Sequence, residues 1–296
     1  MIQVIPVMNA KGGVGKTTTA VNLAAGLARR GRRVLLVDLD SQGSASLSLG
    51  VEKTERSVAA ALFGEMPFGM TVRRTHLPGL SIAPSSPALA NADVRLAPLP
   101  NRVSRLREVL GPVRMAYDVI VIDCAPASSL LNVNALVAAD GFIVPVSPDF
   151  LSVKSLFTLE QTVHAVRRLM GQVAPILGIL LTHATAAPDQ AGEDAVYDML
   201  RKRYGGKLLG PTVGRHVALQ EAPVLGVDIF EYAPGDPAAA DYDAVVEDVA
   251  SRLERYSAVF PNTDRAYVSP AKADAIVAAA DFGEREAETE GLELVA

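Results

Sequence analysis

A glycine-rich loop with two lysines directly follows the first apolar run of the chain. Lys11-Gly12-Gly13-Val14-Gly15-Lys16-Thr17-Thr18 comes after Ile2–Met8. Glycines let successive backbone N–H groups converge on phosphate oxygens, and a helix that starts at Thr17 adds the positive end of its dipole. Lys16 can reach the β- and γ-phosphates, and the Thr17 hydroxyl can ligate Mg²⁺. The pattern predicts a cradle for a nucleoside triphosphate.

The loop departs from the usual phosphate-binding pattern at one position and gains a lysine at the next. The usual pattern has glycine where this chain has Ala10, and Lys11 stands at the entrance of the loop. A loop with two lysines is the deviant form of the Walker A motif. We expect the backbone and side chains of the whole loop, Lys11 to Thr18, to hold the nucleotide.

Two carboxylates follow other strand-like runs and are expected beside the loop. Asp123 ends one apolar run, and Asp40 follows another on a loop rich in Ser, Gln and Gly. Asp123 fits the acidic partner of Thr17 at a magnesium ion. Asp40 is placed to orient the attacking water, because phosphoryl transfer needs positioning more than covalent chemistry. Thr17, Asp40 and Asp123 are therefore the residues expected around the metal.

Apolar strand-like runs alternate with helical patterns along the chain, which predicts an α/β fold with a doubly wound, mostly parallel sheet and helices on both faces. In such sheets ligands bind at the carboxyl ends of the strands, where all these motifs fall. The expected strands are Ile2–Met8, Arg33–Asp38, Leu80–Ala83, Asp118–Asp123, Gly141–Val146, Ile176–Thr182 and, more weakly, Asp228–Glu231. The expected helices are Thr18–Arg30, Val103–Leu110, Leu130–Ala138, Ser152–Met170, Glu193–Tyr204 and Ala238–Tyr256.

Composition limits the class of protein. The chain has 296 residues, 49% of them hydrophobic, and no signal peptide or run of about 20 apolar residues is recognisable. The single cysteine, Cys124, excludes an intrachain disulfide and a Cys-rich metal site, and it is expected to be a small buried residue. The four histidines lack metal-ligand spacing, so no metal beyond Mg²⁺ is expected. A cytoplasmic protein follows as the default.

The net charge of −5 lies entirely in the last part of the chain. Residues 257–296 hold eight acidic residues against three basic ones, so residues 1–256 are neutral. We expect one ATPase domain over 1–256 and an acidic, flexible or loosely docked tail over 257–296, with one helical candidate at Ala271–Phe282. A segment that binds a partner is the alternative for this tail. A neutral body can still carry a local basic face.

The sequence resembles the ParA/Soj partition ATPases, within the MinD/ParA group of deviant-loop ATPases, over about Ile2 to Tyr256. The resemblance implies a P-loop fold, ATP and Mg²⁺ as cofactors, and a homodimer that sandwiches two ATP molecules. The matching segments are Lys11–Thr19, Val34–Gly43, Tyr117–Asp140, Val144–Leu156 and Leu219–Pro223 followed by Tyr232-Ala233-Pro234.

The resemblance also assigns roles to single residues. It implies that Lys11 reaches across the dimer to the nucleotide of the other subunit, that Lys16 is needed for ATP binding, and that Asp40 is needed for hydrolysis only. The region after Asp123 is expected to act as a switch. A lysine supplied in trans would stabilise charge on the transferred phosphoryl group, as an arginine finger does.

Members of this family bind DNA without regard to sequence when ATP has joined them into dimers, and a ParB-like, centromere-binding partner stimulates hydrolysis. We therefore expect a nucleoid-associated protein. The chain departs from the family at two DNA-contact arginines, since it has Ala184 to Pro188 after one strand and Ala218 before the Leu-x-Glu-Ala-Pro segment. The candidate replacements are Arg201, Lys202, Arg203, Lys207 and Arg215, with Arg167 and Arg168 nearby in sequence.

Arg215 also matches the family's Pro-Arg-Asn segment, where His216 replaces the asparagine, and both residues are expected near the adenine base. Other functions stay open from sequence alone. They are a positioning ATPase for a protein cargo, a MinD-like ATPase that cycles on membranes, and an enzyme of nitrogenase-reductase or biotin-synthesis type. The acidic C-terminal region disfavours the membrane alternative, and the single cysteine disfavours the reductase.

Overall fold

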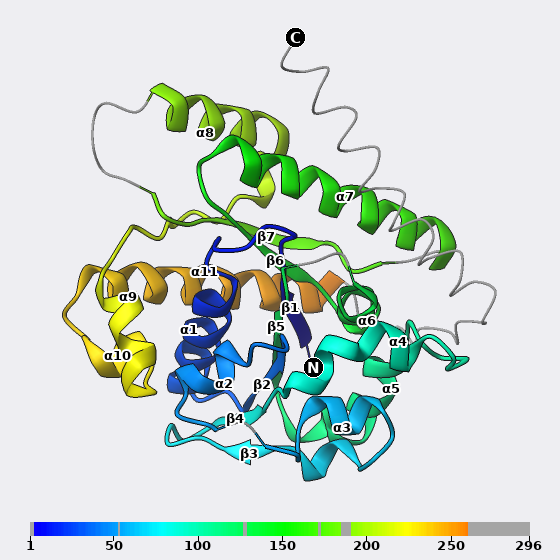
Figure 1. The fold of residues 1–296 in the computed structure, drawn as a ribbon. Coiled ribbons are helices and arrows are strands. Elements are labelled where there is room, and N and C mark those ends of the chain that lie inside the picture. Colours follow the sequence, from blue (N-terminus) through cyan, green and yellow to red (C-terminus); the bar gives the residue numbers. More distant parts are fainter. Residues whose placement is uncertain (1–2, 53, 127–128, 171–172, 185–190, 260–296) are drawn as a thin grey trace.

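A computed structural model describes residues 3–52, 54–126, 129–170, 173–184 and 191–259 (Figure 1). Seven strands form one sheet in the order β3-β4-β2-β5-β1-β6-β7. All neighbours pair in parallel except β3, which runs antiparallel to β4 at the edge. The strands are β1 (Gln3–Val7), β2 (Val34–Leu39), β3 (Arg73–Arg74), β4 (Leu80–Ala83), β5 (Val119–Cys124), β6 (Phe142–Val146) and β7 (Ile176–Leu181).

Helices cover both faces of the sheet, as the uninterrupted apolar strands require. One face packs on α3 (Val58–Leu62), α4 (Ala92–Leu96), α5 (Arg105–Leu110), α6 (Leu130–Ala138), α7 (Phe150–Met170) and α8 (Ala191–Tyr204). The other packs on α1 (Lys16–Arg29), α2 (Ser44–Ser48), α9 (Ala218–Glu221), α10 (Ile229–Tyr232) and α11 (Pro237–Val259). Short 3₁₀ turns join several of them: η1 (Phe68–Met70), η2 (Pro87–Asn91), η3 (Gly111–Ala116), η4 (Gly205–Lys207) and η5 (Ala222–Leu225). The predicted doubly wound, mostly parallel α/β fold is confirmed.

Strand order and register bring the predicted motifs to one edge. Strand β1, which leads into the glycine-rich loop, lies between β5 and β6. Val7 of β1 pairs with Asp123 of β5, and Asp123 pairs on its other side with Asp38 of β2. The carboxyl ends of β1, β2 and β5 are therefore level, so residues more than 100 positions apart in sequence meet at the loop.

One predicted element is wrong. Asp228–Glu231, read as a weak strand, begins helix α10 instead, because the Asp228 carboxylate accepts a hydrogen bond from Glu231 N and caps the first turn. The edge strand β3 was not predicted, since two exposed arginines carry no apolar pattern. Helix α11 continues to Val259, three residues beyond the expected domain limit. The predicted tail beyond it, with its helical candidate, lies outside the described residues.

None of the helices within the described ranges is long and apolar enough to span a bilayer.

Candidate nucleotide site

The glycine-rich loop wraps around the N-terminus of α1. Gly13 and Gly15 have φ values of 74° and 79°, a left-handed conformation that a residue with a Cβ rarely adopts. Gly15 is the N-cap of α1, and no side chain caps the helix there. The free backbone N–H groups of the first turn are left to bind an anion at the positive end of the helix dipole.

Lys16 extends back over the loop that precedes it. Its side chain is buried, and its ammonium donates a 2.7 Å hydrogen bond to the Lys11 carbonyl. Burial lowers the pKa of Lys16, while the nearby Asp123 raises it. A cation held inside the loop in this way is placed to meet phosphate oxygens.

Thr17 and Asp123 form the pair expected at a metal. The Thr17 hydroxyl donates a 2.8 Å hydrogen bond to Asp123 Oδ2. The other carboxylate oxygen, Oδ1, is buried and has no hydrogen-bond partner among the described residues. Burial and the neighbouring Asp38 raise the pKa of Asp123 well above its ordinary value. A hydroxyl oxygen beside a buried, unsatisfied carboxylate fits a divalent cation such as Mg²⁺, whose charge would keep this group ionised.

Asp38 holds the loop that carries Asp40. The Asp38 carboxylate is fully buried and accepts hydrogen bonds from the backbone N–H and the hydroxyl of Ser46, at 2.8 and 2.6 Å. The backbone carbonyl of Asp40 accepts a hydrogen bond from the Ser85 hydroxyl. The Asp40 carboxylate itself is partly exposed, and among the described residues it accepts a hydrogen bond only from Gln42 N, at 2.9 Å. Asp40 is thus fixed through its backbone while its carboxylate stays available.

Lys11 is held within its own subunit. Its ammonium forms a 2.7 Å ion pair with Asp149 and donates a 3.0 Å hydrogen bond to the Ser152 hydroxyl. The Asp149 carboxylate also accepts hydrogen bonds from the Ser147 hydroxyl and from Ser152 N. Although partial burial raises the pKa of Asp149, these donors outweigh it and hold the pKa well below its ordinary value. Sequence reasoning missed Asp149, although it lies in the family-matching segment Val144–Leu156.

Asn9 was also missed, and it anchors the loop to the sheet. Its amide nitrogen donates to the Pro145 carbonyl at 2.7 Å, and its oxygen accepts from Lys11 N at 3.1 Å and from the Ser155 hydroxyl at 2.6 Å. The signal in the sequence was an amide side chain between an apolar strand and the loop. In the structure this amide is buried and therefore needs hydrogen-bond partners.

A cavity of about 240 Å³ adjoins the loop beside Gly15 and Thr18. Arg215 and His216, the two residues expected near the adenine base, line it. The His216 ring lies 2.7 Å from Asp241, which fixes its orientation. His183 also lines the cavity, and burial and the nearby Arg215 lower its pKa.

The predicted DNA residues do not form one group. Residues Leu208 to Gly214 run parallel to β7, so Lys207 lies near the amino end of this strand and Arg215 near its carboxyl end. Seven extended residues separate the two by roughly 20 Å. Arg203 is committed to the fold, since its guanidinium pairs with Glu160 at 3.0 Å and stacks 4.6 Å from the centre of the Phe157 ring. Arg201, Lys202 and Lys207 remain exposed.

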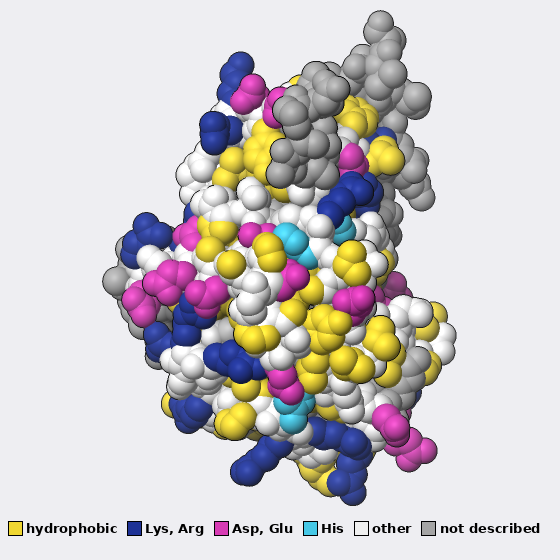
Figure 2. Space-filling view, turned by 90° about the vertical axis from the view of Figure 1, so that its left-hand side faces the viewer, with side chains coloured by type: hydrophobic (Ala, Val, Ile, Leu, Met, Phe, Trp, Pro, Cys, Tyr) yellow, Lys and Arg dark blue, Asp and Glu magenta, His cyan; other side chains and the backbone are white. Residues whose placement is uncertain are grey.

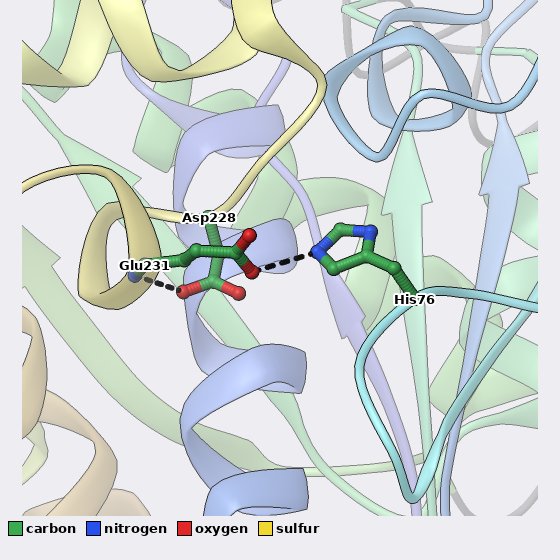
Figure 3. A group of neighbouring side chains, drawn as sticks. All are labelled: His76, Asp228 and Glu231. Atoms are coloured by element: carbon green, nitrogen blue, oxygen red, sulfur yellow. Dashed lines mark hydrogen bonds and ion pairs between the residues drawn. The ribbon is translucent and has the colours of Figure 1, made fainter.

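A second group of metal-ligating residue types lies away from the loop (Figure 3). His76 Nε2 is 3.0 Å from Glu231, and the buried Asp228 lies beside them. Both Asp228 oxygens already accept hydrogen bonds from the Arg29 guanidinium, at 3.0 and 2.9 Å, and Asp228 Oδ1 also caps α10. The group is an ion-pair cluster that joins α1 to α10, because the Arg29 cation occupies the place a metal would need.

Cys124 is buried and its thiol is free, as predicted. Burial and the neighbouring Asp123 raise the pKa of this thiol well above its ordinary value, which makes it a poor nucleophile.

A phosphate-binding loop between a central parallel strand and a helix, with a hydroxyl and a buried carboxylate beside it, defines a P-loop nucleotide hydrolase. Comparisons with known proteins give the family within this class. Residues 2–176 match the family described as an AAA domain, AAA_31. The chain belongs to this family and to its Soj and ParA group of ATPases.

Two relatives and one solved structure illustrate the match. The chromosome-partitioning ATPase Soj of Thermus thermophilus is 40% identical over 84% of this chain and 96% of its own length. The sporulation initiation inhibitor protein Soj of Bacillus subtilis is 37% identical over 85% of this chain and 99% of its own length. The structure of cobyrinic acid a,c-diamide synthase of Mycobacterium smegmatis, solved with ADP and magnesium, is 28% identical and matches with a TM-score of 0.74. The match covers 86% of this chain and 96% of the synthase chain.

These comparisons confirm the predicted family and the class of ATPase. The nucleotide and magnesium in the solved relative agree with the ATP and Mg²⁺ expected for this chain.

Proposed function

We propose that this protein is an ATP-dependent dimerising ATPase that binds DNA without sequence preference and takes part in partitioning DNA molecules. The observation that carries the proposal is the Lys11–Asp149 ion pair at the nucleotide edge. It holds the second lysine of the loop in a partly exposed position, on a carboxylate that lies outside the phosphate loop. The relatives named as partition proteins support the biological setting.

Each polar group at the edge has a task in hydrolysis. The loop amides and Lys16 bind the phosphates, and the cavity with Arg215 and His216 takes the base. Thr17 and Asp123 would hold Mg²⁺, which neutralises phosphate charge when bound. Asp40 orients a water molecule for in-line attack on the γ-phosphate, so that ADP and phosphate leave.

Lys11 completes the neighbouring subunit's site in this proposal. On ATP binding, Lys11 leaves Asp149 and meets the triphosphate of the second subunit, where it stabilises the charge that develops on the γ-phosphoryl group. The exchange of a carboxylate for a phosphate as partner keeps the ammonium paired in both states. The dimer then persists until hydrolysis removes the phosphate that holds it together.

Mixing two inactive variants tests this arrangement. Lys11→Ala lacks the lysine given to the partner, and Asp40→Ala lacks the water-orienting carboxylate. If Lys11 acts in trans, a mixed dimer has one complete site, on the Lys11→Ala subunit. An equal mixture should regain about a quarter of wild-type turnover, because about half of the dimers are mixed and each has one active site. Turnover no higher than that of either variant alone would show that Lys11 does not act in trans.

DNA binding is assigned to a basic face where α7, α8 and η4 end. We define the basic face as Arg167, Arg168, Arg201, Lys202 and Lys207. All five side chains are exposed, and none forms an ion pair with a described residue. Asp198 lies one helical turn before Lys202 and makes no ion pair with it. Such a concentration of unpaired cations favours a polyanion.

Other arginines at the same edge of the sheet contrast with the basic face. Figure 2 shows Lys and Arg side chains beside Asp and Glu side chains on the flank that includes α11. Each arginine at the end of α1 and before β2 pairs with a carboxylate at 2.7 to 3.0 Å. The pairs are Arg29 with Asp228, Arg30 with Asp243, Arg32 with Glu254 and Arg33 with Asp118. The arginines of this flank are neutralised, whereas the cations of the basic face are not, and we therefore assign DNA binding to the basic face.

Two basic faces in one dimer act together on one duplex, so dimerisation strengthens binding through effective concentration. ATP thus controls DNA association although the basic face is distant from the nucleotide. A ParB-like, centromere-binding partner that accelerates hydrolysis would release the dimer, and the working place of the protein would be the nucleoid in the cytoplasm.

A further inference from the structure

The basic face has an occupant within the same chain: we propose that the acidic segment of residues 260–296 binds the basic face and competes there with DNA. The inference rests on the proposed function for its consequence, but the contact itself needs neither ATP nor DNA. Charge, position and length support it separately.

Charge is complementary. Residues 260–296 contain eight acidic residues and three basic ones, whereas the rest of the chain is neutral overall. Five of the acids fall within ten residues: Glu284, Glu286, Glu288, Glu290 and Glu293. The basic face offers five cations without carboxylate partners among the described residues. The four arginines beside α1 are not free in that way, because each is paired with a carboxylate.

The segment starts close to the basic face. It follows Val259, the last residue of α11. Two turns earlier, Arg252 donates hydrogen bonds to the carbonyls of Lys207 and Leu208, at 3.3 and 2.6 Å. About 10 Å of helix separates Arg252 from Val259. The described part of α11 therefore ends about 10 Å beyond the contact with the η4 end of the basic face, and Glu254 on the same last turns pairs with Arg32.

The length of the segment is sufficient. Glu284 is 25 residues beyond Val259, a tether that can reach up to about 80 Å. Arg203 gives the scale of the basic face, because it joins the end of α8 to Glu160 of α7. Arg167 lies two turns beyond Glu160, about 10 Å further along α7. The acids can therefore reach both helices.

Exposed ion pairs contribute little each, about 0–1 kcal/mol, so the contact is reversible. A tethered segment is nevertheless present at an effective concentration on the order of 1 mM. A local dissociation constant of about 0.1–0.3 mM would then weaken DNA binding by a monomer roughly four- to tenfold. The tail lowers the affinity of each face, so a monomer binds DNA weakly. A dimer regains DNA binding because its second face binds the same duplex at a high effective concentration.

A spin label tests the contact directly in the full chain without DNA or nucleotide. Thr289→Cys places a label among the glutamates, and Cys124 is buried and does not compete for it. We expect paramagnetic broadening of the amide signals of Arg201, Lys202 and Lys207 at low salt, and its loss at 0.5 M salt. The signals of Arg30 and Arg32 should stay sharp. Broadening that is absent, or as strong at Arg30 and Arg32, would overturn the proposal.

Charge variants provide the matched controls. In the labelled protein, Arg201→Glu with Lys202→Glu should abolish the broadening, whereas Arg30→Glu with Arg32→Glu should leave it unchanged. Replacing the five glutamates of 284–293 by glutamine should raise the affinity of the nucleotide-free protein for a short duplex roughly four- to tenfold at 50 mM salt. An affinity that stays the same would contradict competition with DNA.

The two proposals fail separately. If the label contact is observed but the protein binds no DNA, the tail contact stands and the proposed DNA binding is wrong. If the protein binds DNA through the basic face but shows no label contact, only the proposed tail contact is wrong.

Discussion

The nucleotide edge of the sheet and the basic face at the opposite edge hold their charges in opposite ways. At the carboxyl edge each charged group has a fixed neighbour: Lys11 binds Asp149, Lys16 binds a carbonyl, and Asp123 accepts from Thr17. At the amino edge the cations of the basic face have no carboxylate partner among the described residues. Fixed charges suit chemistry, in which tenths of an ångström matter, and free charges suit the attraction of a partner whose sequence is not read.

The contrast predicts unequal sensitivity to mutation. A substitution at the nucleotide edge should remove a function, whereas a substitution on the basic face should weaken binding in proportion to the charge removed.

Lys16→Ala should have the largest effect. The ammonium is buried inside the loop, and its charge-assisted contacts to phosphate cannot be replaced from solvent. We expect ATP affinity to fall roughly 100-fold or more, measured by calorimetric titration. Lys11→Ala is the control, since it should leave ATP binding by the monomer nearly unchanged. ATP binding that survives in Lys16→Ala would remove the loop from its assigned role.

Asp40→Ala should be next. Within the part of the chain that the structure describes, the carboxylate binds only Gln42 N, so its loss leaves the phosphate cradle intact. Turnover should fall roughly 100- to 1,000-fold in a phosphate-release assay, with ATP affinity within about twofold of wild type. Equal losses of affinity and turnover would mean that Asp40 supports nucleotide binding instead of orienting water.

Charge reversal on the basic face should have a smaller and graded effect. Arg201→Glu with Lys202→Glu should weaken the binding of the ATP dimer to duplex DNA about 10- to 100-fold at 50 mM salt, and should lower the slope of log affinity against log salt. Arg30→Glu with Arg32→Glu is the matched control and should change affinity less than threefold. Equal effects of the two pairs would erase the distinction between the basic face and the paired flank.

The smallest effect concerns the paired flank itself. Asp118 pairs with Arg33. Hydrogen bonds from the guanidinium and the backbone N–H of Arg33 lower the pKa of Asp118 to about 2. A lowered pKa contributes stability that is fully present above the ordinary value of 3.8 and is lost as the pH falls through about 2. Asp118→Asn should cost a few tenths to 1 kcal/mol at pH 7, in urea unfolding. The difference from wild type should shrink towards pH 2; a constant difference would exclude the ion pair as its source.

The sequence predicted most of the sheet and the phosphate loop because both depend on local patterns. Apolar runs marked six strands within one or two residues, and glycine spacing marked the loop. Contacts between residues that are distant in sequence could not be predicted from these local patterns. Asp149 meets Lys11 across 138 positions, and nothing near Asp149 in sequence indicates this contact. Arg203 and Arg215 show the same limit: both belong to a basic stretch of sequence, yet one pairs with Glu160 and the other lies at the opposite end of β7.

The proposed function depends most on ATP joining two chains face to face. Sedimentation velocity of Asp40→Ala, with and without saturating ATP and Mg²⁺, tests this directly because blocked turnover preserves the assembled state. We expect a monomer without nucleotide and a dimer with it, and a monomer again when Lys16→Ala is added. A monomer at saturating ATP would contradict the proposed function.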